Sequence, residues 1–144
     1  MVQDDATRLL RAAREAIVHA YAPYSGFPVG AAVLTGAGDI FAGCNVENAA
    51  YPLGLCAEAA ALGAMVSAVG AQRVRAALVV TARRHPSWPC GGCRQRLQEF
   101  MAQDAIVYAA GCEGEPISMP FTRLLPLAFG ATDIASSMRP DHGL

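Results

Sequence analysis

Three cysteines and one glutamate carry the chemistry that this sequence offers. Cys56 and Glu58 stand in the segment Cys56-Ala57-Glu58, and Cys90 and Cys93 form a Cys-x-x-Cys pair later in the chain. Three thiolates can bind Zn²⁺ tetrahedrally and leave one coordination position open, which is typical of a catalytic zinc site. Glu58 lies close enough to the first thiolate to transfer protons without being a ligand. We therefore predict a catalytic zinc site in which Cys56, Cys90 and Cys93 are ligands and Glu58 transfers protons.

Two other interpretations of these cysteines stay open. A structural zinc knuckle takes a fourth ligand, for which Cys44 or Cys112 is available, but it typically has a second Cys-x-x-Cys or a Cys/His pair. A redox-active Cys-x-x-Cys would leave Cys56 and Glu58 without a role. Both interpretations explain fewer of the residues than a catalytic zinc site does.

The elements that position these residues are two helix starts. Apolar periodicity predicts helices over Asp4–Ala20, Cys56–Val69 and Cys90–Met101. Both ligand segments therefore lie where a loop enters a helix. A helix amino end carries unpaired N–H groups and about half a positive charge, so two such ends facing each other would stabilise three thiolates.

The remaining elements predict an α/β fold. A loop is expected over Asn48–Leu55 and a short helix over Phe121–Leu125. The order of helices and strands indicates a three-layer α/β/α arrangement with a mixed central sheet of about five strands. The length of the chain, 144 residues, suits a single catalytic domain over 1–144, in which 131–144 is a loosely held tail. Strands are predicted at Val29–Thr35, Ile40–Val46, Val74–Thr81, Ala105–Ala110 and Ile117–Met119.

Composition narrows the class of protein. The net charge is −1, whereas a protein that holds long nucleic acids usually has a basic excess, so we expect a small-molecule substrate and no nucleic acid polymer. No apolar run reaches the roughly 18 residues of a membrane span, and the amino terminus does not resemble a signal peptide. The 53% hydrophobic fraction is high and suggests subunit interfaces. An odd count of five cysteines favours metal binding in a reducing cytoplasm.

Six segments of the chain together carry a family resemblance. They are Tyr24-Ser25-x-Phe27 with Val29-Gly30-Ala31-Ala32, Gly43-Cys44-Asn45-Val46-Glu47-Asn48-Ala49 with Tyr51, Cys56-Ala57-Glu58, Pro89-Cys90-Gly91-x-Cys93-Arg94-Gln95, Leu124-Leu125-Pro126, and Phe129. In their order and approximate spacing, over roughly Leu9 to Gly130, they resemble the small, homotetrameric, zinc-dependent cytidine deaminases. The resemblance implies hydrolytic deamination of cytidine and deoxycytidine, with release of ammonia, in pyrimidine salvage.

The resemblance also implies roles at the reacting end of the substrate. Cys56, Cys90 and Cys93 would bind zinc, and Glu58 would be the proton shuttle. The backbone N–H of Ala57 would hold the pyrimidine carbonyl. The carbonyl of Trp88 would meet the departing amine.

Further implied roles concern the base, the sugar and the neighbouring subunit. Phe27 would pack near the base, while Asn45 and Glu47 would hold ribose hydroxyls. Buried polar groups that bind ribose hydroxyls are left without partners when the ligand has no sugar, so such a site rejects the free base. We therefore expect the substrate to be a nucleoside rather than free cytosine. Tyr51 and Phe129 resemble positions at which a neighbouring subunit of a homotetramer completes the pocket.

The sequence departs from the family pattern in its basic residues. Many tetrameric members have an arginine after the catalytic glutamate, where this chain has Ala59. Blasticidin S deaminases have one between the paired cysteines, where this chain has Gly92. Arg94, which follows the last ligand, is left as a possible donor. Either the site relies on helix ends and has a higher pH optimum, or the substrate is a modified or antibiotic cytosine nucleoside such as blasticidin S.

Overall fold

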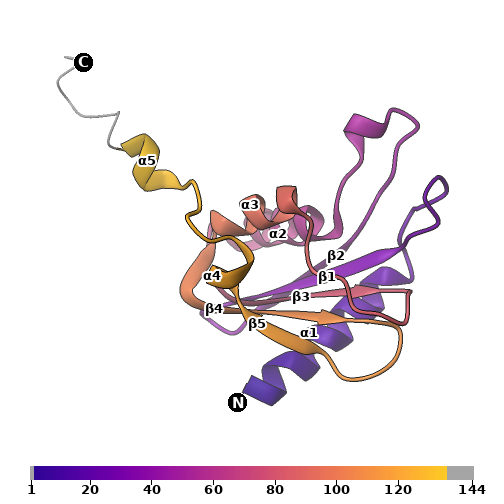
Figure 1. The fold of residues 1–144 in the computed structure, drawn as a ribbon, viewed down its shortest axis with the longest axis horizontal. Coiled ribbons are helices and arrows are strands. Elements are labelled where there is room, and N and C mark those ends of the chain that lie inside the picture. The colour runs from indigo at the N-terminus through magenta and orange to yellow at the C-terminus, as the bar shows by residue number, and fades with distance from the viewer. Residues whose placement is uncertain (1, 136–144) are drawn as a thin grey trace.

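One five-stranded mixed sheet organises the protein, which a computed structural model describes over residues 2–135 (Figure 1). The strands are β1 (Val29–Thr35), β2 (Ile40–Cys44), β3 (Val74–Thr81), β4 (Met101–Ala110) and β5 (Ile117–Pro120). The helices are α1 (Val2–Ile17), α2 (Ala57–Val69), α3 (Gly91–Gln98), α4 (Phe121–Leu124) and α5 (Ala131–Ala135), with a 3₁₀ helix η1 (Tyr51–Leu53). The strand order is β2-β1-β3-β4-β5; β3 and β4 run parallel, and the other neighbouring pairs run antiparallel.

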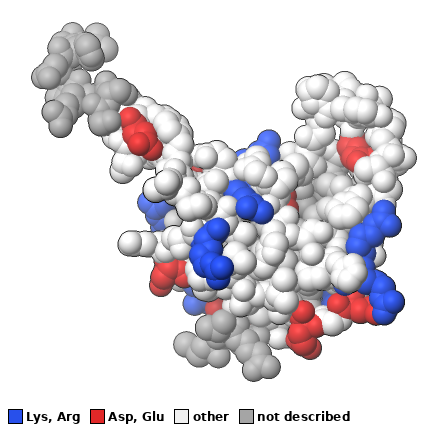
Figure 2. All heavy atoms as spheres, in the orientation of Figure 1, with Lys and Arg blue, Asp and Glu red and all other residues white. Residues whose placement is uncertain are grey.

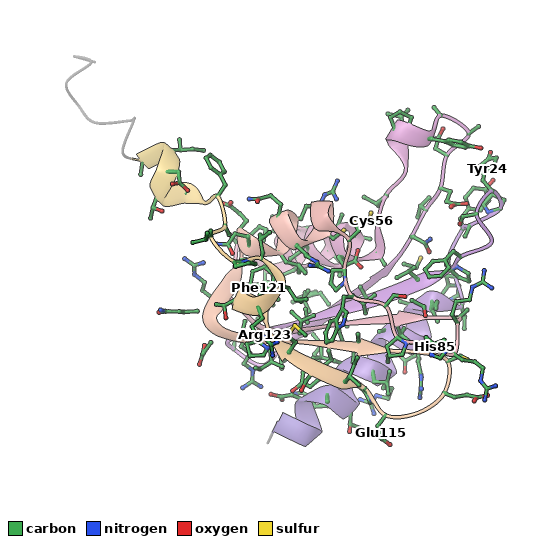
Figure 3. The ribbon with its side chains drawn as sticks, viewed as in Figure 1. Tyr24, Cys56, His85, Glu115, Phe121 and Arg123 are labelled. Atoms are coloured by element: carbon green, nitrogen blue, oxygen red, sulfur yellow. The ribbon has the colours of Figure 1, made fainter. Side chains whose placement is uncertain are left out.

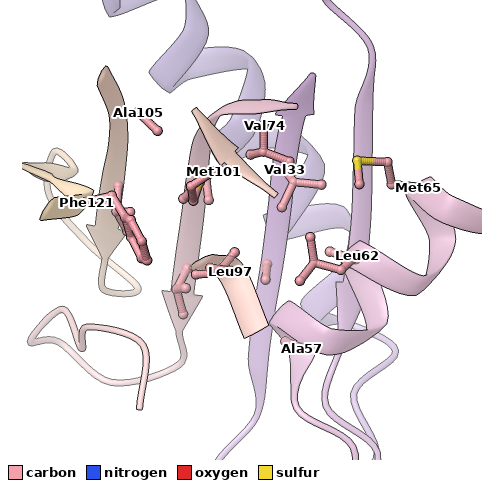
Figure 4. Close-up of a cluster of buried hydrophobic side chains, with 14 of the residues drawn as sticks. Val33, Ala57, Leu62, Met65, Val74, Leu97, Met101, Ala105 and Phe121 are labelled. Atoms are coloured by element: carbon pink, nitrogen blue, oxygen red, sulfur yellow. The ribbon is translucent and has the colours of Figure 1, made fainter. Parts of the chain in front are cut away.

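Helices cover both faces of the sheet, because successive side chains of a strand point to opposite faces. On one face Leu9 and Ala13 of α1 pack against Leu34 and Leu78. On the other face α2, α3 and α4 pack against the alternate residues, such as Val33 (Figure 4). The predicted three-layer α/β/α arrangement with a mixed five-stranded sheet is confirmed.

The central strand β3 is buried on both faces. Of its residues Val74–Thr81, Arg75 is exposed and the others are buried. This is the continuous apolar pattern expected of a strand covered by helices on both sides. It explains why the strand was predicted with its observed bounds.

Strand pairing makes α3 end and β4 begin earlier in the chain than the sequence predicts. The prediction of a third helix reaching Met101 is wrong: α3 ends at Gln98, and Met101 begins β4, ahead of the expected start at Ala105. The cause is the parallel neighbour, since Val74 pairs with Met101 and its N–H donates to the Phe100 carbonyl at 2.8 Å.

Three further boundaries differ from expectation. α1 ends at Ile17, before the predicted end at Ala20. β2 ends at Cys44 rather than Val46. Residues 131–135 of the predicted tail form the exposed helix α5, and the rest of that tail lies outside the described residues.

Residues 46–55, which we call the arm, stand away from the body of the molecule (Figure 1). Val46 and Leu55 close its base through two backbone hydrogen bonds of 2.9 and 2.8 Å. The tip holds η1, which the loop prediction for Asn48–Leu55 did not include. Tyr51 and Leu53 there are 75% and 71% exposed, so the arm carries apolar side chains that its own chain does not cover.

The charged side chains are dispersed. Figure 2 shows basic and acidic residues scattered over an otherwise uncharged face. None of the helices described here has the length and apolar character required to span a bilayer.

Candidate active site

Three thiols meet where α2 and α3 begin. Cys56 is the N-cap of α2 and Cys90 the N-cap of α3, both with extended backbone, and Cys93 lies in the first turn of α3. Their sulfur atoms lie within 4.8 Å of one another. Within residues 2–135 they form the one such group of potential ligands. Figure 3 shows Cys56 at the start of α2, at the foot of the arm.

This donor set fits a zinc ion. With Zn–S bonds of about 2.3 Å, tetrahedral thiolates lie roughly 3.8 Å apart, which is compatible with three sulfur atoms that all lie within 4.8 Å of one another. Burial raises the pKa of the Cys93 thiol, and the neighbouring Glu58 and Cys56 raise it further. Holding these groups together as anions therefore requires a cation of high charge, and Zn²⁺, which thiolates bind well, meets that need.

Glu58 and Ala57 lie beside the thiols in the first turn of α2. Glu58 is only 6% exposed although it is an acid, and it lies within hydrogen-bonding reach of Cys93. The N–H of Ala57 belongs to the helix start, where no intrahelical acceptor exists, and no side chain caps α2. The site thus offers a buried carboxylate and a free backbone donor next to the three thiols.

A cavity of about 610 Å³ opens onto these groups. Its size is in the range of pockets that bind small molecules. The described wall comes from the loop before β1, from the arm, from the start of α2, from the end of β3 and from the loop before α3. Of the residues predicted for the site, the wall includes Phe27, Asn45, Glu47, Tyr51, Cys56, Ala57, Glu58, Trp88 and Cys90.

Asn45 and Glu47 first organise the loop before β1. The Asn45 side chain accepts from the Val29 N–H and donates to the Phe27 carbonyl, each at 2.9 Å. Glu47 accepts from the N–H groups of Tyr24 and Ser25 at 2.9 and 3.1 Å. An amide and a carboxylate each have further hydrogen-bonding positions, so both residues can still face a ligand in the cavity.

The loops that frame the cavity are tied together by aromatic contacts. The rings of Tyr24 and Tyr51 meet edge to face, with centroids 6.0 Å apart, and join the loop before β1 to the arm. Arg83 lies on the loop after β3, and its guanidinium is 5.6 Å from the centroid of the Phe27 ring. Phe27 is thereby held at the wall of the cavity.

Cys93, which is fully buried, is one predicted site residue that does not line this cavity, and Phe129 is the other. It follows α4, is 58% exposed, and its carbonyl accepts from the Gln95 side chain at 2.9 Å. Leu127 nearby is fully exposed and has a left-handed backbone with φ of 54°, which is uncommon for a leucine. The segment after α4 thus presents apolar side chains away from the cavity of its own chain.

The arginine that contacts the thiols is Arg96, which the sequence analysis missed. Its Nη1 donates to the Cys93 Sγ at 3.6 Å. Contact with Cys93 raises the pKa of Arg96, so its guanidinium stays charged. Arg94, the expected candidate, instead donates to the backbone carbonyls of Pro89 and Leu124 at 2.7 and 3.0 Å. The sequence does contain a signal for this contact: Cys93 and Arg96 are three residues apart, and residues at that spacing share one face of a helix.

Comparisons with known proteins place the chain among zinc-binding deaminases. Residues 3–110 match the family model of the cytidine and deoxycytidylate deaminase zinc-binding region. A cytidine deaminase of Sporosarcina psychrophila is 40% identical over 131 residues, which are 91% of this chain and 96% of that protein. One of Halalkalibacterium halodurans is 41% identical over 90% of this chain and 98% of its own length. The crystal structure of a Burkholderia pseudomallei cytidine deaminase superposes with a TM-score of 0.79 at 42% identity, covering 85% of this chain and 98% of the other. With its fold, its matching family model and its relatives in agreement, the chain belongs to the zinc-binding cytidine and deoxycytidylate deaminase family.

Proposed function

We propose that this protein converts cytidine and deoxycytidine to uridine and deoxyuridine by zinc-dependent hydrolysis, with release of ammonia. The observation that carries the proposal is the cluster of Cys56, Cys90 and Cys93 beside the buried Glu58. That cluster faces a cavity of suitable size for a nucleoside. The relatives at about 40% identity that are named cytidine deaminase support the same substrate class.

Glu58 is the residue that moves protons. Cys56, Cys90 and Cys93 would hold the zinc ion, which would supply a Lewis acid able to make a water molecule nucleophilic near neutral pH. The Glu58 carboxylate takes a proton from the attacking water and delivers it to the ring nitrogen. It then takes the second proton from the new hydroxyl group on the ring carbon and gives it to the amine, so that the carbon–nitrogen bond breaks, ammonia leaves and the carbon–oxygen bond becomes a carbonyl. Burial keeps this carboxylate close to the reacting atoms and away from bulk water.

The substrate is oriented by groups along the cavity wall. The free N–H of Ala57 binds the pyrimidine carbonyl, and the carbonyl of Trp88 accepts from the departing amine. Phe27 packs against the base. The remaining hydrogen-bonding positions of Asn45 and Glu47 hold the ribose hydroxyls.

We also propose that the chain acts as a homotetramer of single-domain subunits. Residues exposed on the outer side of α2, including Val66 and Val69 at 42% and 43%, are almost all apolar or small. A helix that is apolar all round is normally buried, so a second copy of the chain is the natural cover. Exposed Tyr51 and Phe129 would then be shared between subunits, and Phe129 of one copy would help close the cavity of another.

The cellular setting follows from the same chemistry. Thiolate ligands persist in a reducing compartment, which supports a cytoplasmic enzyme. Its reaction would return cytosine nucleosides to the uracil pool, as pyrimidine salvage requires. Cell fractionation with an antibody against the protein tests the location.

An ultraviolet assay of the zinc-loaded protein tests the activity. We expect turnover of cytidine and deoxycytidine and little or none of cytosine, which lacks the sugar. Glu58→Gln keeps the shape of the side chain but cannot carry the proton. It should lower kcat by at least about a thousandfold while zinc content stays near that of the wild type.

Two results would contradict the proposal. Turnover of blasticidin S but of neither ordinary nucleoside would mean that the reaction is right and the substrate is wrong. Full activity of Glu58→Gln would remove Glu58 from the mechanism. A salt-dependent shift of single-stranded RNA or DNA in a gel would instead favour a polymer substrate.

A further inference from the structure

We propose that Arg96 is a positioning residue of the metal centre, whose guanidinium offsets the excess negative charge of the three thiolates. A divalent metal with three thiolates has a net charge of −1. The carboxylate of Glu58 adds a second negative charge next to it. A fixed positive charge on the ligand shell would reduce this excess and favour metal binding.

The geometry brings Arg96 to the ligands along one face of α3. Cys93 and Arg96 are three residues apart in this helix, so their side chains are neighbours, and Nη1 donates to Sγ at 3.6 Å. Cys90 and Cys56 lie within 4.8 Å of Cys93 through their sulfur atoms. The charge of Arg96 therefore acts on the whole cluster and not on one ligand alone.

Gly92 and Arg96 are neighbours along α3. A Cβ built at Gly92 would lie 3.4 Å from the Nη1 of Arg96, which is ordinary van der Waals contact. The guanidinium therefore lies directly beside the position between the two cysteines, where this chain has no side chain.

Other basic groups near the site are otherwise engaged. Arg94 donates to the carbonyls of Pro89 and Leu124, and so ties the start of α3 to the end of α4. Position 59, in the first turn of α2, is an alanine and carries no charge. In the part of the chain described, Arg96 is the basic side chain with a hydrogen bond to a ligand sulfur.

Zinc affinity tests this role without substrate. In competition with a chromogenic chelator, Arg96→Gln should bind zinc about tenfold more weakly, the usual size of an effect from outside the ligand set. Arg96→Lys should recover part of the loss. Because Arg96 is exposed, salt should screen its charge, so the difference between wild type and Arg96→Gln should shrink at high ionic strength.

Controls separate the charge from the fold. Arg14→Gln removes the same charge from the exposed side of α1, on the opposite face of the sheet, and should leave zinc affinity unchanged. The cobalt-substituted variant should keep its thiolate charge-transfer bands, because the ligands remain. Wild-type zinc affinity in Arg96→Gln, or an equal loss at low and high salt, would overturn the proposal. Since no substrate is present, this outcome is independent of whether cytidine is the substrate.

Discussion

Glu47 is held as an anion by the loop that it organises. The side-chain hydroxyl of Ser25 and the backbone N–H groups of Ser25 and Tyr24 all bond to its carboxylate. These bonds favour the charged form and lower the pKa of Glu47 below the ordinary value of a glutamate. The bonds to the charged form are present at neutral pH and are lost only as the pH falls through the lowered pKa of Glu47. Because neutral pH lies well above that pKa, Glu47 is charged throughout the range in which the enzyme is expected to work.

A Ser25→Ala substitution tests this arrangement. Removing the hydroxyl should move the pKa of Glu47 back toward the ordinary range, and the rise of KM at acid pH should begin at a higher pH than in the wild type. The measurement is KM for cytidine between pH 7 and pH 4. The control is Ser118→Ala on β5. If KM rises at the same acid pH in Ser25→Ala as in the wild type, Ser25 does not lower the pKa of Glu47.

The residues of the metal site were easier to predict than the residue beside them. Three cysteines and a glutamate at this spacing have few alternative uses, so the types and spacing of Cys56, Cys90, Cys93 and Glu58 pointed to zinc. Arg96 has many alternative uses, and its distance from sulfur depends on where α3 begins. Once Cys90 is known to be the N-cap, Cys93 and Arg96 must share a helix face.

Among the elements, β2 and α2 approach so closely that only a glycine fits between them. A Cβ at Gly43 would lie 2.6 Å from the Ala60 Cβ and 2.7 Å from the Ala61 backbone nitrogen. The contact falls in the first turns of α2, directly after Cys56 and Glu58. The position of the segment that carries Cys56 and Glu58 therefore depends on the absence of a side chain in the neighbouring strand.

We expect Gly43→Ala to damage both stability and the site. Forcing α2 away from the sheet should cost about 1–3 kcal/mol of unfolding free energy and weaken zinc binding. Urea denaturation and chelator competition measure the two effects. Gly36→Ala is the matched control, because a Cβ there would meet the nearest atom at 3.9 Å. Wild-type stability and zinc affinity in Gly43→Ala would contradict this account of the packing.

Element boundaries were predictable where local pattern and tertiary pairing agree. Val29–Thr35 and Val74–Thr81 are apolar runs that the sheet uses in full, and both were predicted with their observed bounds. Pairing with β3 takes Met101 into β4, although local periodicity continued the helix. The backbone of Asn45 bonds to Val29 and that of Val46 to Leu55, so β2 stops at Cys44. These long-range pairings leave no local signal.

For the whole molecule, the apolar segment after α4 predicts association. Leu127 is fully exposed and has a left-handed backbone, which turns an apolar side chain toward solvent. Contact with a second subunit would bury that side chain. Leu127→Asp should lower the molar mass in light scattering toward that of a monomer. It should reduce kcat/KM at least about tenfold if subunits share the pocket, while zinc content is retained.

The matched control for this substitution lies on the opposite face of the sheet. Val18, just after α1, is 75% exposed, and Val18→Asp adds the same charge there. It should leave both molar mass and activity unchanged. A wild-type protein that stays monomeric with full activity would refute shared pockets altogether.

The positions of the metal ligands along the chain also concern folding. Cys56 precedes β3 and Cys90 follows it, so a metal held by both closes a loop that contains the whole central strand. Closing such a loop removes conformational freedom from the unfolded chain. Metal binding free energy then becomes folding free energy, since the unfolded chain has no preformed site. The ion that supplies the chemistry is therefore also a cross-link, and zinc scarcity would loosen the middle of the sheet as well as silence the enzyme.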